Sequence, residues 1–92
     1  MMSVQEEVLE EVKTKEKVNK QNQIIVFNDD VNTFDHVIDM LIATCDHDPI
    51  QAEQCTMLIH YKGKCEVKTG DYDDLKPRCS KLLDAGISAE IQ

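Results

Sequence analysis

One continuous apolar run, Ile24-Ile25-Val26-Phe27, constrains the fold of this chain more than any other feature of its sequence. Its β-branched side chains and its lack of polar positions are typical of a buried strand. The run stops at Asn28-Asp29-Asp30, a polar cluster that is typical of a turn. The sequence therefore predicts a buried strand over residues 24–27 and a turn directly after it.

Helical periodicity follows this turn. Apolar residues recur at three- and four-residue intervals from Phe34 to Cys45, which predicts an amphipathic helix with Asn32 or Thr33 as its N-cap. Asp48-Pro49 is typical of the start of a second helix, and a glycine follows at the position expected for its end. We expect the apolar residues of this second helix to form its buried side: Ile50, Cys55, Leu58 and Ile59.

The C-terminal third adds two strands and one helix. Residues 64–69 alternate between polar and apolar and predict a half-exposed strand. A third helix should then face inward with Leu75, Cys79, Leu82 and Leu83, interrupted by a kink or a lead-in turn at Pro77. Residues 87–91 predict a last strand. The order β-α-α-β-α-β predicts an α+β fold, a three-stranded sheet with the helices packed on one face.

The length and composition indicate one domain with an aliphatic core. The chain has 92 residues, of which 41% are hydrophobic and only 4% aromatic. Residues 1–22 lack glycine, proline and aromatic residues and are rich in Glu and Lys. We therefore expect a flexible charged arm over residues 1–22 and a core domain over residues 23–92.

The charge of the chain disfavours two classes of partner. A formal net charge of −8 repels both the phosphates of nucleic acids and anionic membrane surfaces. No apolar run approaches the roughly 20 residues that a membrane-spanning helix needs. The acidic N-terminus also lacks the apolar segment of a secretory signal, so we expect a cytoplasmic protein.

The four cysteines, at positions 45, 55, 65 and 79, predict free thiols rather than disulfides in a reducing compartment. All four occupy apolar phases of their elements, which favours core packing over reactivity. Cys45-Asp46-His47 contains a single Cys-x-His unit, too little for a structural zinc site. Because the sequence also lacks a glycine-rich phosphate loop and a nucleophile–base arrangement, we expect no cofactor and no enzymatic activity.

Two places remain as candidates for binding. Asn28-Asp29-Asp30 stands at the end of a buried strand, where ligand sites are common, but these residues could equally complete the turn and cap the next helix. His60 lies near the end of the second predicted helix. It could contact a ligand, or its imidazole could be placed there by the negative end of the helix dipole. The spacing leaves both alternatives open.

Two segments, IIVFNDDVNTFDHVIDML and AEQCTMLIHYKGKC, resemble the ClpS family of adaptors, which pass N-degron substrates to Clp-type AAA+ unfoldase–protease machines. The resemblance extends over residues 23–92 and is strongest in the NDD triplet, the helix around Val37–Leu41 and the segment HYKGK. The ClpS fold, shared with the C-terminal domain of the ribosomal stalk protein, is the β-α-α-β-α-β sandwich predicted above.

The resemblance implies roles for individual residues. Asn28 and His60 should hydrogen-bond the α-amino group of a substrate. Asp29 and Asp30 should supply negative charge beside it. This charge suits an α-amino group, which has a pKa of about 8 and is mostly cationic at neutral pH. A hydrophobic pocket should accept the first side chain, and its wall positions are Asn32, Phe34, Val37, Thr56, Ile59 and Ile87. Thr56 stands where the family often has Met, and Phe34 occupies the position of a gate residue.

The resemblance also implies partners. Asp73 and Arg78 match the positions that contact the N-terminal domain of a ClpA- or ClpC-type unfoldase. We therefore expect a monomeric, non-enzymatic adaptor that binds bulky hydrophobic N-terminal residues and delivers their proteins for ATP-dependent proteolysis. Two alternatives remain: an interaction module of the same fold that does not bind N-degrons, and a protein that uses its cysteines for thiol or metal chemistry.

Overall fold

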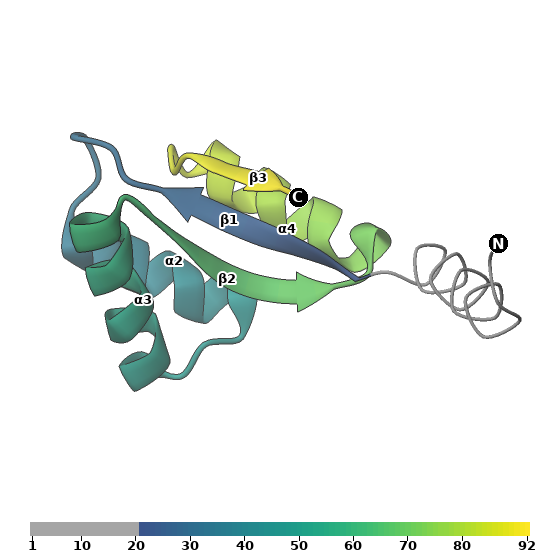
Figure 1. Ribbon diagram of the computed structural model, residues 1–92, viewed down its shortest axis with the longest axis horizontal. Coiled ribbons are helices and arrows are strands. Elements are labelled where there is room, and N and C mark those ends of the chain that lie inside the picture. The colour runs from purple at the N-terminus through teal and green to yellow at the C-terminus, as the bar shows by residue number, and fades with distance from the viewer. Residues whose placement is uncertain (1–20) are drawn as a thin grey trace, which may run out of the picture.

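The computed structural model describes residues 21–92, so the arm predicted over residues 1–22 lies, except for its last two residues, outside this part of the chain. Six elements follow one another in the order that the sequence predicts (Figure 1). They are β1 (Asn22–Phe27), α2 (Phe34–Cys45), α3 (Pro49–Lys62), β2 (Lys64–Gly70), α4 (Tyr72–Asp84) and β3 (Ala89–Ile91).

The sheet is antiparallel and has the strand order β2-β1-β3. The apolar run of β1 is therefore the central strand. Ile24 and Val26 lie in the core, whereas Ile25 points to the opposite face, where its cross-strand partners are Glu66 and Glu90. Ile25 is nevertheless buried, because strands flank it on both sides. A central position thus explains why residues 24–27 of β1 carry apolar side chains on both faces.

Local signals set the helix ends. The Thr33 hydroxyl accepts a hydrogen bond from the His36 N–H at 3.1 Å and starts α2. The Asp48 carboxylate accepts one from the Gln51 N–H at 2.7 Å and starts α3. Gly63, which ends α3, has a φ of +92°, a left-handed conformation that glycine adopts without strain. These ends agree with the sequence-based prediction.

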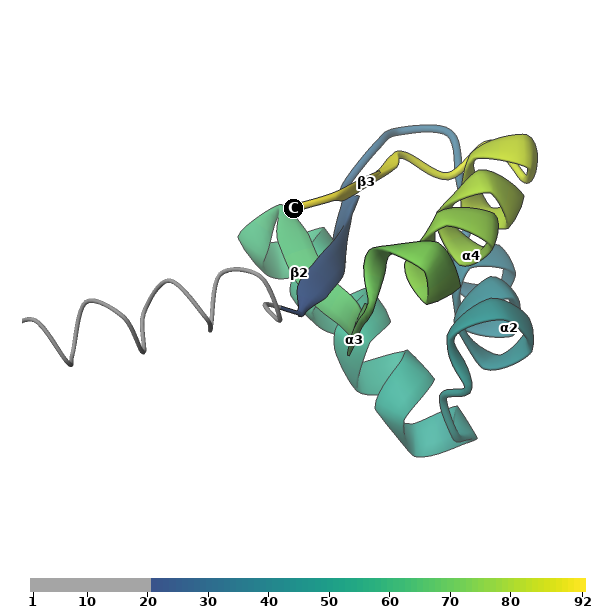
Figure 2. The same cartoon turned by 90° about the vertical axis from the view of Figure 1, so that its right-hand side faces the viewer.

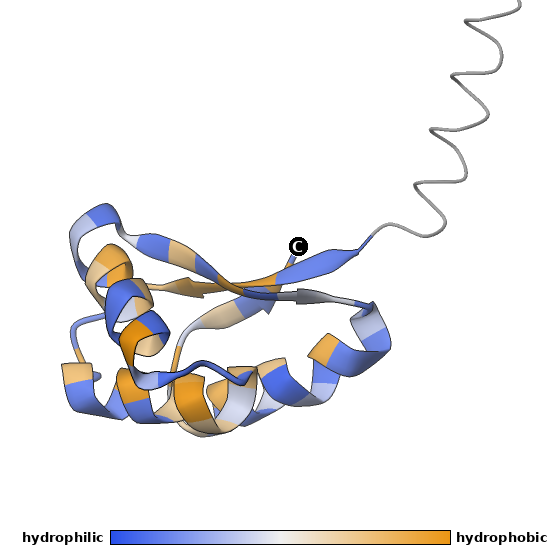
Figure 3. Ribbon diagram, turned by 90° about the horizontal axis from the view of Figure 1, so that it is seen from below, coloured by the Kyte–Doolittle hydropathy of each residue, from blue (hydrophilic) through white to orange (hydrophobic). Residues whose placement is uncertain are grey.

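The helices form one layer and the strands the other, as the perpendicular views show (Figures 2 and 3). The core between the layers is aliphatic, as predicted, and none of its buried members is aromatic within residues 21–92. These members are Ile24, Val26, Val37, Leu41, Cys45, Ala52, Ile59, Val67, Leu75, Cys79, Leu82 and Ile87. The α+β fold predicted from the order of the elements is therefore confirmed.

The predicted buried side of α3 is partly wrong. Ile50 is 75% exposed and Leu58 is 45% exposed, whereas Ile59 is buried and Cys55 is half-buried. The inward positions of α3 are instead occupied by Ala52, Thr56 and Ile59. Apolar residues occur on both faces of this helix, so their presence alone does not identify the face that packs on the core.

One prediction for α4 is also wrong, and the structure excludes one of the two alternatives expected at Pro77, a separate lead-in turn. Leu83 is exposed, because a rotation of about 100° separates it from Leu82, which points into the core. Pro77 lies inside a helix that runs from Tyr72 to Asp84 without a separate lead-in turn. Its ring removes one backbone hydrogen bond, to the carbonyl of Asp73, and Asp73 is exposed to water that can replace that bond.

Candidate functional site

The loop between β1 and α2 is held in shape by the Asp29 carboxylate. This group accepts hydrogen bonds from the Val31 N–H at 3.0 Å, the Asn32 N–H at 2.9 Å and the Asn32 side-chain amide at 2.7 Å. The hydrogen bond from the Asn32 backbone, followed by the others, holds the pKa of Asp29 below its usual range. Asp29 is therefore an ionised group that shapes the turn.

Two side chains tie this loop to the turn after α4. The Asn32 amide also donates to the Gly86 carbonyl at 2.9 Å, and the His36 Nε2 lies 2.9 Å from the Ala85 carbonyl. His36 is a residue that the sequence did not single out. Its partner is 49 positions away along the chain, so no local pattern could have indicated the contact. The loop is therefore held by the Asp29 carboxylate within it, and it is tied through Asn32 and His36 to the carbonyls of Gly86 and Ala85.

The remaining residues of the NDD triplet face solvent. The Asn28 N–H donates to the Gly63 carbonyl at 2.8 Å, which joins the triplet to the end of α3. Asn28 and Asp30 are both exposed. In the part of the chain that the structure describes, neither side chain forms a hydrogen bond with another residue. Both are therefore free to contact a ligand.

His60, on the last turn of α3, lies across from the start of α2. Its ring centroid is 5.2 Å from that of Phe34 and 5.0 Å from that of Tyr61, with the Tyr61 ring edge-on. His60 itself is exposed, and Phe34 is 41% exposed. The structure therefore brings together the NDD triplet, His60 and Phe34, which come from a strand end and from two helices.

The predicted pocket wall is mostly part of the core. Val37, Thr56, Ile59 and Ile87 are between 2% and 8% exposed. The Thr56 hydroxyl donates back to the Ala52 carbonyl at 2.7 Å, so its polar group is satisfied within α3. Val37, Ile59 and Ile87 belong to the core cluster, whereas Asn32 and Phe34 are partly exposed.

The two predicted unfoldase contacts have different surroundings. Asp73 is exposed on the first turn of α4. Arg78 donates to the Thr44 carbonyl at 2.8 Å and forms ion pairs with Asp46 at 3.0 Å and Asp74 at 3.3 Å. The Arg78 guanidinium thus links α4 to the end of α2, while Asp73 remains available to a partner.

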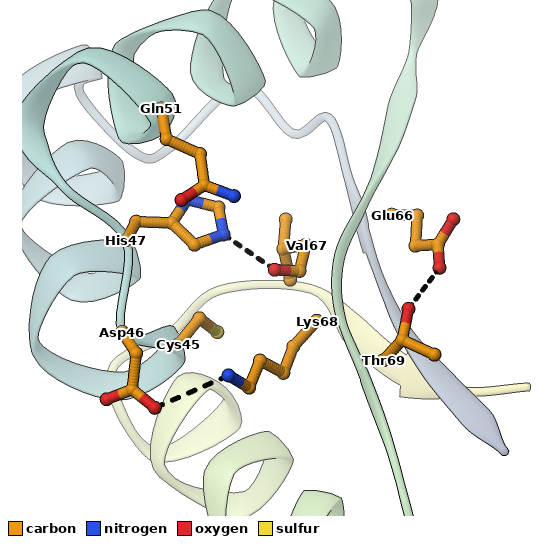
Figure 4. Close-up of a pocket in the computed structure, with 8 residues that line it drawn as sticks. All are labelled: Cys45, Asp46, His47, Gln51, Glu66, Val67, Lys68 and Thr69. Carbon is orange, nitrogen blue, oxygen red and sulfur yellow. Dashed lines mark hydrogen bonds and ion pairs between the residues drawn. The ribbon is translucent and has the colours of Figure 1, made fainter.

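A cavity of about 290 Å³ lies elsewhere, between the end of α2 and β2 (Figure 4). Its lining residues are Cys45, Asp46, His47, Gln51, Glu66, Val67, Lys68 and Thr69. His47 is buried, and its Nε2 donates to the Val67 carbonyl at 2.6 Å. Within residues 21–92 no three His, Cys, Asp or Glu side chains are grouped so that they could hold a metal ion.

The four thiols are unpaired, and all of them pack in or against the core, as predicted. Burial raises the pKa of the Cys45 thiol to about 11 and, with a hydrogen bond to Cys55, that of Cys65 to about 12. Burial also raises the pKa of Cys79. Thiols with raised pKa values stay protonated at neutral pH and are weak nucleophiles, which argues against thiol catalysis.

Comparison with known proteins agrees with the observed fold. The family described as "ATP-dependent Clp protease adaptor protein ClpS" matches residues 17–90. The solved structure of Agrobacterium tumefaciens ClpS2 bound to L-phenylalaninamide shares the fold, with a TM-score of 0.71. It is 18% identical in sequence, and the match covers 79% of this chain and 98% of that one.

No curated protein matches the sequence significantly. Among the described residues, no helix is both long and apolar enough to cross a membrane. The family match spans most of the chain, and the fold of a solved ClpS protein matches the order of elements found here. This chain therefore belongs to the ClpS family of ATP-dependent Clp protease adaptors.

Proposed function

We propose that this chain is a non-enzymatic adaptor that binds proteins through a free, bulky hydrophobic N-terminal residue. It then delivers them to a AAA+ Clp unfoldase–peptidase. Membership of the ClpS family supports the adaptor role. The arrangement of polar and aromatic side chains at the start of α2 supports the choice of ligand.

The observation that carries the proposal is the backbone hydrogen bond from Asn28 to Gly63 at 2.8 Å. It brings the NDD triplet beside the end of α3, near His60. An α-amino group is mostly cationic at neutral pH, and an ionised carboxylate forms a strong, charge-assisted hydrogen bond with it. Asp30 and the side chains of Asn28 and His60 would bind this ammonium, while Asp29 holds the loop in position.

The first side chain of the substrate would enter beneath Phe34. We assign the apolar groups of Val37, Ile59 and Ile87 to the wall of this pocket, and burying a Phe or Leu side chain among them would contribute about 1.5–3 kcal/mol. Phe34 is half-exposed and rests on His60, so it can act as the gate that moves aside. The ligand of ClpS2, L-phenylalaninamide, also combines an amino group with an aromatic side chain.

Delivery requires a second surface. We place the contact with the N-terminal domain of the unfoldase at the exposed first turn of α4, around Asp73. Arg78 would support this surface through its ion pairs rather than contact the partner alone. Reversing the charge of Asp73 should weaken unfoldase binding and leave peptide binding unchanged.

Fluorescence anisotropy with short peptides tests the ligand. Peptides that begin with Phe, Tyr, Trp or Leu should bind, while their N-acetylated twins and a peptide that begins with Val should not. Asp30→Asn should weaken binding of the Phe peptide at least about tenfold, which corresponds to the loss of one charge-assisted hydrogen bond. Asp39→Asn, which changes an exposed carboxylate on α2, is the matched control.

Asp30 is a better target than Asp29, because replacing Asp29 would also disturb the turn that it holds. Equal affinity for free and acetylated peptides would contradict the proposal. So would unchanged affinity in the Asp30→Asn variant. Absence of binding in a folded sample would favour the alternative, an interaction module of this fold that does not bind N-degrons.

A further inference from the structure

The turn between α4 and β3, residues 85–88, is hydrogen-bonded to the segment that leads from β1 into α2. The His36 Nε2–H donates to the Ala85 carbonyl at 2.9 Å, and the Asn32 amide donates to the Gly86 carbonyl, also at 2.9 Å. These contacts join residues 49 and 54 positions apart, and the two segments lie side by side (Figure 2). We call residues 85–88 the α4–β3 turn.

The second half of the α4–β3 turn is held by backbone contacts. The Phe27 N–H donates to the Ser88 carbonyl at 2.9 Å, and the Ile87 N–H donates to the Leu82 carbonyl at 3.0 Å. Gly86 has a φ of +82°, a left-handed conformation that glycine adopts without strain and that ends the helix. The backbone is therefore held on both sides of Ile87.

Ile87 is the buried residue of this turn. It is 2% exposed and belongs to the core cluster together with Val37 and Ile59. The proposed function assigns these side chains to the wall of the pocket that accepts the first residue of a substrate. The contacts that hold the α4–β3 turn then also hold one part of that wall.

We propose that His36 is a positioning residue of this pocket, because its hydrogen bond to the Ala85 carbonyl sets the place of Ile87. The inference rests on the proposed function, since it requires Ile87 to line the pocket. His36 does not contact the substrate in this account. It acts through the α4–β3 turn and limits the size of the side chain that the pocket accepts.

The place of His36 in the fold suits this role. Its backbone N–H donates to the Thr33 hydroxyl at 3.1 Å, so the residue is fixed in the first turn of α2. Its ring is half-buried, and its far nitrogen donates to the turn. A short, rigid ring that is held at both ends keeps a defined distance between α2 and Ala85. Such supporting contacts set the precision of a binding site.

Asn32 also bonds to this turn, but it is a poorer target for a test. Its amide donates to the Asp29 carboxylate at 2.7 Å as well, so replacing it would disturb the loop after β1. The His36 side chain is instead separate from the hydrogen bonds of Asp29. A change at His36 can therefore loosen the turn and leave the loop in place.

The pocket should be sensitive to the place of Ile87. A hydrophobic pocket separates side chains that differ by one methylene by about tenfold or more. Loss of the hydrogen bond to Ala85 releases one part of the wall, and a released wall admits a larger side chain more readily. Trp, the largest N-terminal residue, should therefore gain most from this loss.

Fluorescence anisotropy of the full chain with Trp- and Leu-initiated peptides tests the proposal. His36→Leu removes the donor and should raise the affinity for the Trp peptide relative to the Leu peptide about fivefold, the size expected for one hydrogen bond. His36→Gln should restore the wild-type ratio, because its amide nitrogen reaches the place of Nε2. His36→Asn, whose amide is too short, should behave as His36→Leu does and gives a second variant without the donor.

Asn22→Leu is the matched control. The Asn22 amide donates to the Gln92 carbonyl at 3.2 Å, a side-chain-to-backbone contact of the same kind at the other end of β1. Its loss should leave the ratio unchanged. Amide hydrogen exchange, followed by NMR without any peptide, should show Ile87 exchanging about fivefold faster in His36→Leu but not in His36→Gln or Asn22→Leu.

Each outcome decides the question. An unchanged peptide ratio or unchanged exchange at Ile87 in both His36→Leu and His36→Asn would overturn the proposal. So would a changed ratio that His36→Gln does not restore, or an equal change in Asn22→Leu. A wild-type chain that binds none of the free peptides would overturn the proposed function together with this inference. Normal binding by the wild type, with a ratio that His36→Leu leaves unchanged, would overturn the role of His36 alone.

Discussion

Helices α2 and α3 have similar lengths and many apolar residues, but they use them in opposite ways. In α2, Val37, Leu41 and Cys45 face the core. In α3, Ile59 faces inward together with the smaller residues Ala52 and Thr56, and most of the larger apolar residues face solvent. Small inward residues allow a helix to pack closely against its neighbours. The difference teaches that α2 fills the core with large side chains, while α3 packs closely on it and leaves most of its large apolar side chains exposed.

The largest expected effect comes from comparing one leucine of each helix. Leu41 of α2 is fully buried, so Leu41→Ala should lower the free energy of unfolding by about 2–5 kcal/mol. Leu58 of α3 is 45% exposed, and Leu58→Ala should change it by no more than about 0.5 kcal/mol. Urea denaturation measures both. Similar losses in the two variants would contradict the contrast between the helices.

The end of α2 is fixed by Arg78, whose guanidinium donates to the carbonyl of the buried residue Thr44. Arg78→Met should therefore lower the free energy of unfolding by about 1–3 kcal/mol, because this carbonyl would lose its partner. Lys68→Met is the matched control. It removes only the partly exposed ion pair with Asp46, at 3.4 Å, and should cost less than about 1 kcal/mol. If Lys68→Met lowered the free energy of unfolding more than Arg78→Met, the ion pairs of Asp46, rather than the hydrogen bond to Thr44, would be what holds the end of α2 in place.

Acid sensitivity tests the loop that leads into α2. The pKa of Asp29 is lowered by folding, so its contribution is present above the pKa of the unfolded chain, near about 4, and is lost as the pH falls through the lower, folded value. Asp29→Asn should therefore flatten the loss of stability below about pH 4 and cost about 1 kcal/mol at neutral pH. Thermal unfolding between acidic and neutral pH measures this. The same flattening in Asp39→Asn would show that the effect is a general one of charge.

The contrast between the helices also explains what the sequence could predict. β1, α2 and the caps at Thr33 and Asp48 depend on local patterns, and the structure agrees with them. The inward face of α3 could not be identified, because apolar residues occupy both of its sides. The contacts from Asn32 to Gly86 and from His36 to Ala85 join residues 54 and 49 positions apart. Such contacts depend on the packed fold, so periodicity and spacing give no sign of them.

The smallest expected effect concerns the inward face of α3 itself. Thr56→Val keeps the shape of the side chain and removes a hydroxyl that donates to the Ala52 carbonyl. That carbonyl can still accept the helical hydrogen bond from the backbone of residue 56, so no buried group is left without a partner. The free energy of unfolding should change by less than about 1 kcal/mol. Thr56→Leu, which adds volume at the same position, should cost about 1–3 kcal/mol. Urea denaturation of both variants would separate the two explanations: a large loss in Thr56→Val alone would mean that the hydroxyl, rather than the small size, is what this face of α3 requires.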